Sequence, residues 1–260
     1  MMKRRMIAAV CAALLLVLLA PMALAEGVRY EGEGYATAEE ACRAYLEAYN
    51  AGDVQGMLST FAIETYVEHL DRKEQVKRLS AFMMTNLDVL PMPNDFLRDL
   101  LVSMRLGELS QSVYRQYLYY AWPDGYGDMY MANNFKGQEG ELSDVVDEFY
   151  SHFDQAEATG WVGNVELVGF LQPGELGEYG ERFSGERTQE NIEKTRVIHG
   201  SDEIANMAMY LRLGGVDYIQ FMQCERYGEK WYNTTTQSVL SMIVGLESYA
   251  GGLLRLDAAN

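Results

Sequence analysis

Histidine is the residue type in this chain best suited to proton transfer or metal binding, and there are three. They are His69, His152 and His199, and each stands alone in its own segment. Zinc sites built from histidine usually take two ligands from one short stretch, and no such spacing occurs here. A single histidine in a charged helix, such as His69, is more often a solvated or capping residue than a ligand. The sequence therefore predicts no metal site and indicates no cofactor.

Two carboxylates also stand close together, where Asp124 and Asp128 enclose Gly-Tyr-Gly. A calcium loop needs the order Asp-x-Asp-x-Asp-Gly and a distant Glu, so this stretch is more typical of a turn. The chain has no Gly-x-Ser-x-Gly nucleophile elbow and no glycine loop that could hold phosphate. No residue is identified as catalytic, and we expect a protein that is not an enzyme.

Aromatic residues are concentrated between positions 114 and 135. Rings with a polar edge suit sugars and other amphipathic ligands. We favour the other interpretation, in which Tyr114 and Tyr117 belong to the core and the remaining rings pack this segment on the rest of the fold. The residues concerned are Tyr114, Tyr117, Tyr119, Tyr120, Trp122, Tyr126, Tyr130 and Phe135.

Residues 1–25 have the features of a secretory signal peptide. Three basic residues precede an apolar run that is short for a membrane span, and Ala-Leu-Ala at 23–25 is a small-residue cleavage pattern. We expect cleavage after Ala25, with an uncleaved anchor as the alternative. The mature protein would be secreted or extracytoplasmic, at the cell surface, with no stable membrane span. Residues 26–34 are rich in Gly and Glu and are expected to form a disordered linker.

The chain is strongly acidic, with a net charge of −17 that becomes −20 once the three basic residues of the leader are removed. Such a charge repels phosphate backbones, so nucleic acid is not expected as a partner. Binding to an anionic membrane surface is disfavoured for the same reason.

The first strongly patterned element is a helix from about Thr37 to Asn50. Thr37 and Glu40 have capping-box spacing, in which the hydroxyl accepts from the Glu40 N–H and the carboxylate reaches back to the Thr37 N–H. One face of the helix is apolar and the other is charged, as in a helix that covers a core. The apolar face carries Ala38, Ala41, Cys42, Tyr45, Leu46 and Tyr49. Asp53 then caps a second helix that continues to Phe61.

A sheet that these helices could cover is predicted far away in the sequence. Residues 204–235 have the pattern of three strands joined by tight hairpins at Gly214-Gly215 and Gly228-Glu229. Residues 161–172 alternate well enough for a further strand. The end of the chain, from Gly251, is expected to fray.

These two regions resemble the nuclear transport factor 2-like superfamily. The resemblance is carried by EEACRAYLEAYNAGDVQGMLSTFA at residues 39–62 and RYGEKWYNT at residues 226–234. It implies an α+β fold in which a cone-like, curved antiparallel sheet is covered by N-terminal helices. The superfamily also hosts ketosteroid-isomerase-like and SnoaL-like proteins and mixes enzymes, binding modules and assembly domains, so the resemblance does not indicate an activity.

Residues 35–260 are expected to form a single domain of this type. Residues 63–160 depart from the family pattern because the chain stays helical there, which predicts a large helical insertion. One of its helices is expected to begin near Asp95 and end at Gly107, and another to begin at Ser110. Such helices could cover the cone, fill it or extend it.

The resemblance also implies an interior that could hold a ligand. We expect it to be lined by Tyr45, Tyr49, Tyr210, Tyr218 and Trp231. An isomerase of this fold needs a carboxylate base in an apolar cone and a hydroxyl donor for the enolate oxygen. The four tyrosines could supply the hydroxyl, and Asp217 or Glu166 the carboxylate. The sequence singles out no pair, so no active site is carried over.

Cys42 and Cys224 are the cysteines that remain after the leader. The implied fold packs the first helix on the strand that holds Cys224, and export makes a disulfide chemically feasible. The alternative is two small buried hydrophobic side chains, since a bridge needs Cα atoms within about 7 Å of each other.

These features favour an exported, non-catalytic domain that binds a small molecule, a glycan or a cell-envelope partner. One alternative is a ketosteroid-isomerase-like or hydrolase-type enzyme that acts on a hydrophobic substrate. Another is an interaction or assembly module, which could form a homodimer through the open face of its sheet.

Overall fold

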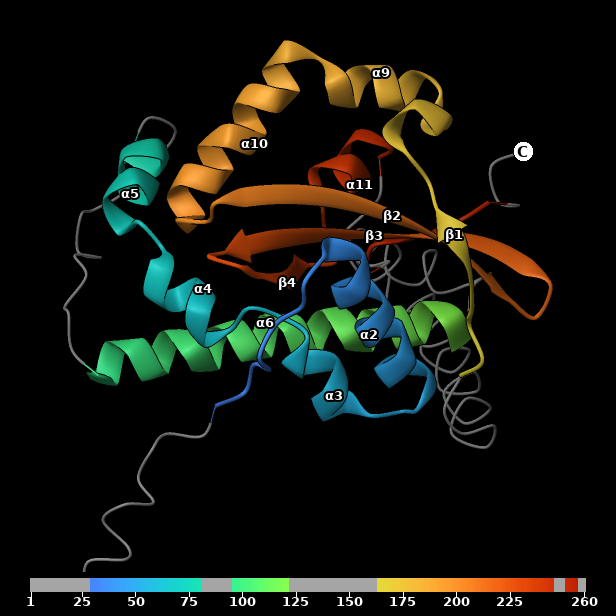
Figure 1. The fold of residues 1–260 in the computed structure, drawn as a ribbon, viewed down its shortest axis with the longest axis horizontal. Coiled ribbons are helices and arrows are strands. Elements are labelled where there is room, and N and C mark those ends of the chain that lie inside the picture. Colours follow the sequence, from blue (N-terminus) through green and yellow to red (C-terminus); the bar gives the residue numbers. More distant parts are fainter. Residues whose placement is uncertain (1–28, 81–94, 122–162, 246–250, 257–260) are drawn as a thin grey trace, which may run out of the picture.

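The computed structural model describes residues 29–80, 95–121, 163–245 and 251–256 (Figure 1). Within them, helices pack on an open antiparallel sheet of five strands, so the predicted α+β class is confirmed. The helical elements are α2 (Ala38–Asn50), α3 (Val54–Ser59), α4 (Glu64–His69), α5 (Arg72–Ser80), α6 (Asp95–Ala121), η2 (Pro173–Leu176), α9 (Glu178–Ser184), α10 (Glu186–His199) and α11 (Val239–Ile243). The strands are β1 (Glu166–Phe170), β2 (Glu203–Leu213), β3 (Val216–Tyr227), β4 (Lys230–Thr235) and β5 (Leu253–Arg255).

The strands β2, β3 and β4 follow the predicted hairpins. Gly214 and Gly215 have φ of +60° and +86°, as a two-residue type I′ turn requires. The order is β1-β2-β3-β4, and β5 pairs with the part of β3 that β4 leaves open. Residues 251–256 are therefore not frayed. Its β5 is held by the sheet, where the Phe221 N–H donates to the Gly252 carbonyl at 2.8 Å.

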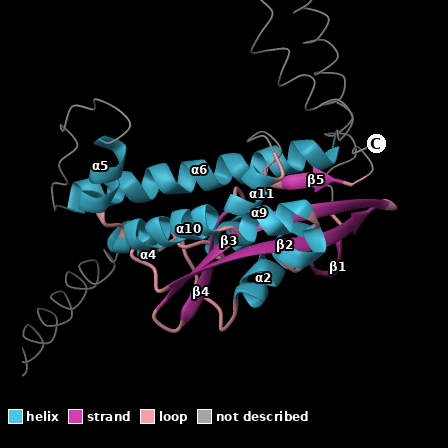
Figure 2. Cartoon of the chain, turned by 90° about the horizontal axis from the view of Figure 1, so that it is seen from above, coloured by secondary structure: helices cyan, strands magenta, loops and turns pink. Residues whose placement is uncertain are grey.

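Side chains of β3 alternate between two cores. Tyr218, Met222 and Cys224 pack beneath α2 and α6, whereas Ile219 and Phe221 face the other way, toward α9 and α11. Figure 1 shows the same division, with α2, α3 and α6 on one side of the sheet and α9, α10 and α11 on the other, and Figure 2 views the domain from the side of α9 and α10. The central strands are consequently covered on both faces.

The helices α2 and α3 begin where the capping pattern places them. The Thr37 hydroxyl accepts from the Glu40 N–H at 3.1 Å, and the Asp53 carboxylate accepts from the Gly56 N–H at 2.9 Å. Glu40 reaches one residue further back than expected, because its carboxylate accepts from the Ala36 N–H at 3.0 Å. The whole predicted apolar face of α2 is buried, which fixes the helix on the sheet.

The described part of the predicted insertion is helical, in α4, α5 and α6. A single helix of 27 residues, α6, replaces the two helices expected there, and Gly107 lies inside it. Val102, Leu109 and Val113 form one buried stripe across that position. Burial of this stripe outweighs the roughly 1 kcal/mol that a glycine costs inside a helix. None of the described helices is long and apolar enough to cross a bilayer.

The segment 29–34 corrects the predicted disordered linker. The Gly32 N–H donates to the Ser59 carbonyl at 2.8 Å. Tyr35, which directly follows this segment, exchanges two backbone hydrogen bonds of 2.9 Å with Trp231. A Cβ at Gly32 would lie 3.1 Å from the Ser59 carbonyl oxygen. The glycine content that indicated disorder here reflects, at least at Gly32, a close approach of two backbones.

The junction of α10 with α4 gives a test of the fold. Gly200 has φ of +65°, and a Cβ there would lie 2.2 Å from the His69 carbonyl oxygen, whereas Gly214 has a similar φ and open space. We expect Gly214→Ala to lower the free energy of unfolding by about 1–2 kcal/mol, the cost of the backbone conformation alone. Gly200→Ala should cost about 3 kcal/mol because the end of α4 must also move. Urea denaturation of both variants measures the difference, and equal losses would contradict the close packing of α4 on α10.

Candidate functional site

Three of the five aromatic residues predicted to line a pocket lie in the core. Tyr45 and Tyr49 are fully buried on α2, and Tyr218 of β3 is 2 % exposed. Tyr120 of α6 connects them, since its ring centroid lies 5.5 Å from that of Tyr49 and 5.3 Å from that of Tyr218. Burial raises the pKa of Tyr45 and of Tyr49 far above the ordinary value, so both are neutral phenols. These side chains are part of the hydrophobic core.

The insertion fills the space that the family resemblance assigned to a ligand. The Tyr45 hydroxyl donates to the Gln116 side chain of α6, and the Gln116 amide donates to Gln220 of β3 at 2.8 Å. Gln220 in turn donates to the Phe221 and Gly251 carbonyls at 2.7 and 3.2 Å. Of the three roles open to the insertion, α6 therefore fills the interior, where Gln116 is hydrogen-bonded by protein on both sides.

Of the remaining two predicted pocket residues, Trp231 packs against the edge of this core and Tyr210 lies away from it. Trp231 is half-buried on β4, beside Tyr35. Tyr210 lies at the far hairpin, where its hydroxyl donates to the Asp217 carboxylate at 2.5 Å and Arg212 donates to the same group at 2.7 Å. These bonds, first from Arg212 and then from Tyr210, lower the pKa of Asp217. An isomerase base needs a raised pKa in an apolar site, and Asp217 has neither.

The carboxylate of Glu166 does not complete an isomerase site either, because the residue is exposed at the start of β1. The aromatic stretch is only partly core. Tyr120 is buried as expected for packing, but Tyr114 is 49 % exposed, which corrects its assignment to the core. Residues 122–135 lie outside the described part of the chain.

An open polar groove lies on the side of the domain where the N-terminal segment, α4 and α6 meet. It encloses about 620 Å³, within the roughly 300–1,000 Å³ typical of small-ligand sites. Its walls are mainly charged and hydroxyl side chains. The lining residues are Arg29, Tyr30, Glu31, Glu64, Thr65, Glu68, Arg98, Asp99, Val102 and Ser103.

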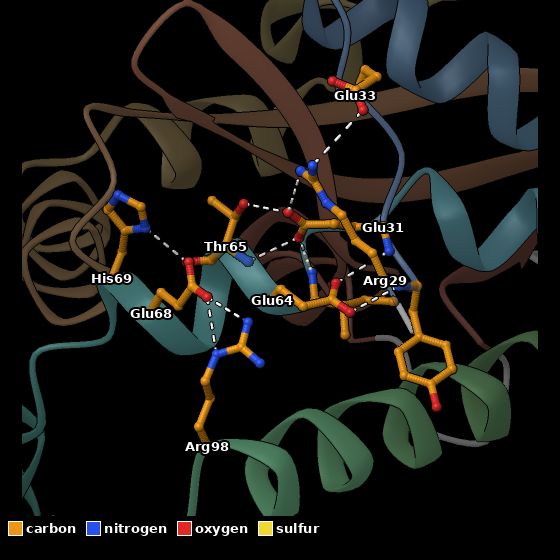
Figure 3. Close-up of polar contacts among 10 residues, drawn as sticks. Arg29, Glu31, Glu33, Glu64, Thr65, Glu68, His69 and Arg98 are labelled. Carbon is orange, nitrogen blue, oxygen red and sulfur yellow. Dashed lines mark hydrogen bonds and ion pairs between the residues drawn. The ribbon is translucent and has the colours of Figure 1, made fainter. Parts of the chain in front are cut away.

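Two buried glutamates hold this groove together by capping each other's segment. The Glu31 carboxylate accepts from the Ile63 N–H at 2.8 Å and the Thr65 N–H at 2.9 Å, at the start of α4. The Glu64 carboxylate accepts from the Tyr30 and Glu31 N–H groups at 2.8 and 3.2 Å. Figure 3 shows both carboxylates between the two segments. A negative charge at the start of a helix also interacts favourably with the positive end of the helix dipole.

The charged groups on the rim of the groove balance one another. Arg98 rises from α6 and donates through Nε and a terminal nitrogen to Glu68 of α4 at 3.0 and 2.5 Å (Figure 3). Arg29 donates to Glu31 at 3.0 Å, and Asp99 is 3.6 Å from Arg98. The side chains of Arg29, Arg98, Glu68 and Asp99 are all between 43 and 74 % exposed. They are therefore available to a ligand.

Sequence reasoning missed this groove because its residues come from three separate segments. One sequence signal was available. Ile63 precedes α4 at the N-cap position and has no side-chain oxygen, so the helix needs a capping group from elsewhere. Nothing in the sequence identifies Glu31, 32 residues earlier in the chain, as that group.

A second cluster lies under α10, where Glu225 of β3 is buried. Its carboxylate is 2.7 Å from His199 Nδ1 and accepts from Gln223 at 2.7 Å, Thr234 at 3.2 Å and Tyr227 at 3.1 Å. Burial alone would raise the pKa of Glu225, but these partners, chiefly His199, outweigh it and lower that pKa. The cluster is a fully satisfied buried anion that ties α10 to the sheet. No group of three or more ligating side chains suited to a metal occurs among the described residues.

Comparison with known proteins adds little to this geometry. No family model matches the chain, and no curated protein matches it. Among solved structures, the chain is similar to a cystatin-like protein from Ruminococcus gnavus ATCC 29149, with 13 % identity and a TM-score of 0.40. The match covers 78 % of this chain and 41 % of that chain, so this chain spans less than half of its length. A likeness this loose supports no inference about function.

The Glu225 cluster gives a pH-dependent prediction. Because the pKa of Glu225 is lower in the folded state than its unfolded value of about 4.3, its anion stabilises the fold above that pH. This contribution is lost as the pH falls through the folded pKa. We expect Glu225→Gln to reduce the free energy of unfolding by about 2–4 kcal/mol at pH 7, because His199 loses its charged partner, and by less at pH 3.

The exposed Glu203 provides the matched control. Glu203→Gln removes a surface ion pair with Arg226 and should cost at most about 1 kcal/mol at any pH. Denaturation of both variants between pH 3 and 7 measures the loss. A Glu225→Gln deficit that does not shrink toward low pH would contradict the assignment of a buried carboxylate anion.

Proposed function

We propose that this protein is an exported, non-catalytic binding domain whose ligand site is the polar groove between the N-terminal segment, α4 and α6. The groove is the observation that carries the proposal, since the interior at Tyr45, Tyr49 and Tyr218 is occupied by α6. Glu31 and Glu64 fix the backbone under the groove, so its exposed side chains project from a preorganised base. Preorganisation reduces the entropy lost on binding.

The chemistry of the rim favours a neutral, polyhydroxylated ligand such as a glycan. Arg29 and Arg98 offer donors, Glu68 and Asp99 offer acceptors, and these four exposed charges cancel one another. Hydroxyl groups both donate and accept, so a sugar can use both sets. An anionic ligand would also meet the repulsion of a chain whose net charge is −20 once the leader is removed.

The finer family assignment is also a proposal. We place the chain in the nuclear transport factor 2-like superfamily on the motifs at residues 39–62 and 226–234. An α+β architecture with α2 and α3 packed beside a curved sheet supports it. The isomerase or hydrolase alternative gains no support from the described residues, because Tyr45, Tyr49 and Tyr218 are buried in the core, and Tyr210 donates to Asp217, a solvated, ion-paired carboxylate. The homodimer stays a prediction.

Export is proposed from the leader, and the position of the groove is consistent with it. The first residue that lines the groove is Arg29, so cleavage after Ala25 would leave the groove intact. We expect the protein released by cells that carry the full chain to begin at Glu26 and to be secreted or held at the cell surface. N-terminal sequencing of the extracellular fraction measures this, and a chain retained with its leader intact would contradict export.

A substitution in the groove tests the binding site. Arg98→Ala should weaken binding of short neutral oligosaccharides by about tenfold or more, because it removes charged donors to ligand hydroxyls. Its effect on stability should be small, since the Arg98–Glu68 pair is exposed. Arg187→Ala, at an exposed position on α10, is the matched control and should bind as the wild type does. Calorimetry against neutral oligosaccharides, acidic oligosaccharides and basic peptides measures both the site and the class of ligand.

The outcomes of this experiment separate the two parts of the proposal. If only a charged ligand binds and Arg98→Ala weakens it, the groove is the site and the glycan assignment is wrong. If every ligand that binds is indifferent to Arg98→Ala, the groove itself is wrong as the site.

A further inference from the structure

The two cysteines that follow the leader meet in the interior. Cys42 lies on α2 and Cys224 on β3, and their Sγ atoms are 3.6 Å apart although 182 residues separate them in the sequence. Both side chains are fully buried. Both are free thiols in the structure. The expected packing of this helix on this strand is therefore present, and the bridge itself stays a prediction that the sequence alone left open.

The side chain of Asn233 fixes the environment of both sulfurs. Its Oδ1 lies 3.2 Å from Cys224 Sγ and 3.7 Å from Cys42 Sγ, and its Nδ2 donates to the Ala41 carbonyl and the Thr60 hydroxyl, each at 3.0 Å. A thiol is a weak donor, so loss of its proton leaves little hydrogen bonding unsatisfied. The pair is thus held together by α2, β3 and β4 and needs no charged neighbour.

We propose that Cys42 and Cys224 form a structural disulfide when the chain folds in an oxidising compartment. The sulfurs must approach by about 1.5 Å to reach the bond length of roughly 2.05 Å. One thiolate attacks a disulfide of a thiol oxidant and forms a mixed disulfide. The second thiolate then displaces the oxidant's sulfur, so the oxidant's disulfide is reduced by two electrons to two thiol groups, which take up the two protons that the cysteines lose.

Burial determines when this reaction takes place. Desolvation, reinforced by the neighbouring Cys42, raises the pKa of the Cys224 thiol well above its ordinary value. The thiol therefore stays protonated, and a protonated thiol is a poor nucleophile. The bond must therefore form before α2 closes over β3, and once formed it is shielded from reductants. It would join the two parts of the domain that flank the helices α4, α5 and α6.

The test uses the full chain, secreted from cells, with free thiols blocked at harvest. Peptide mapping without reduction is expected to give a Cys42–Cys224 linked peptide, and an intact mass lower than that of the reduced protein by two hydrogen atoms. Unfolding in the presence of reductant should lower Tm by about 5–15 °C, the range for loss of a native disulfide in a domain of this size. The double variant Cys42→Ala/Cys224→Ala is the control, and its Tm should not respond to reductant.

A second arm makes the result independent of export. Reduced, denatured protein is refolded with glutathione disulfide, and folded reduced protein is treated with the same oxidant. We expect the linked peptide after refolding and little of it from the protein that was already folded. Free Cys42 and Cys224 after oxidative refolding would overturn the proposal. So would free thiols in secreted protein that begins at Glu26, whereas a chain that stays in the cell would sink the export proposal and leave the refolding result to decide the disulfide.

Discussion

The structure depends on the burial of one face of β3 beneath α2 and α6. That face carries Tyr218, Gln220, Met222 and Cys224, so an amide is buried together with apolar side chains. A buried amide without partners would cost a few kcal/mol. Gln116 meets the requirement by joining the Tyr45 hydroxyl to Gln220, and these bonds fix α2, α6 and the sheet relative to one another. The interior between these elements is filled by their side chains.

Because α6 fills the interior, the proposed binding surface lies on the outside of the domain. The groove near α4 exists because a short helix with no capping side chain of its own is capped by Glu31, from a segment that runs beside the sheet edge. The same contact holds the segment 29–35 in place and aligns Arg29 with Glu68 and Arg98 across the groove. Stability and the proposed function therefore rest on one pair of buried carboxylates, Glu31 and Glu64.

On the opposite face of the sheet, the buried charge of Glu225 is stabilised by side-chain hydrogen bonds. Glu225 is surrounded by donors from His199, Gln223, Thr234 and Tyr227, and it anchors the C-terminal end of α10. A carboxylate beside a histidine is a common feature of catalytic sites. Here the carboxylate has its hydrogen-bonding capacity fully used within the protein, which is the pattern of a structural anchor.

The sequence by itself determined the elements: the cap at Thr37, the apolar face of α2 and both hairpins of the last third. These are local, since capping, helical periodicity, strand alternation and glycine turns act over a few residues. Tertiary structure alone decided that α6 runs unbroken through Gly107 and fills the interior. It also decided that Tyr45, Tyr49 and Tyr218 are core residues, and that Glu31 caps α4. Each of these outcomes depends on partners distant in sequence, and burial against them outweighs the local preference of glycine, tyrosine or glutamate.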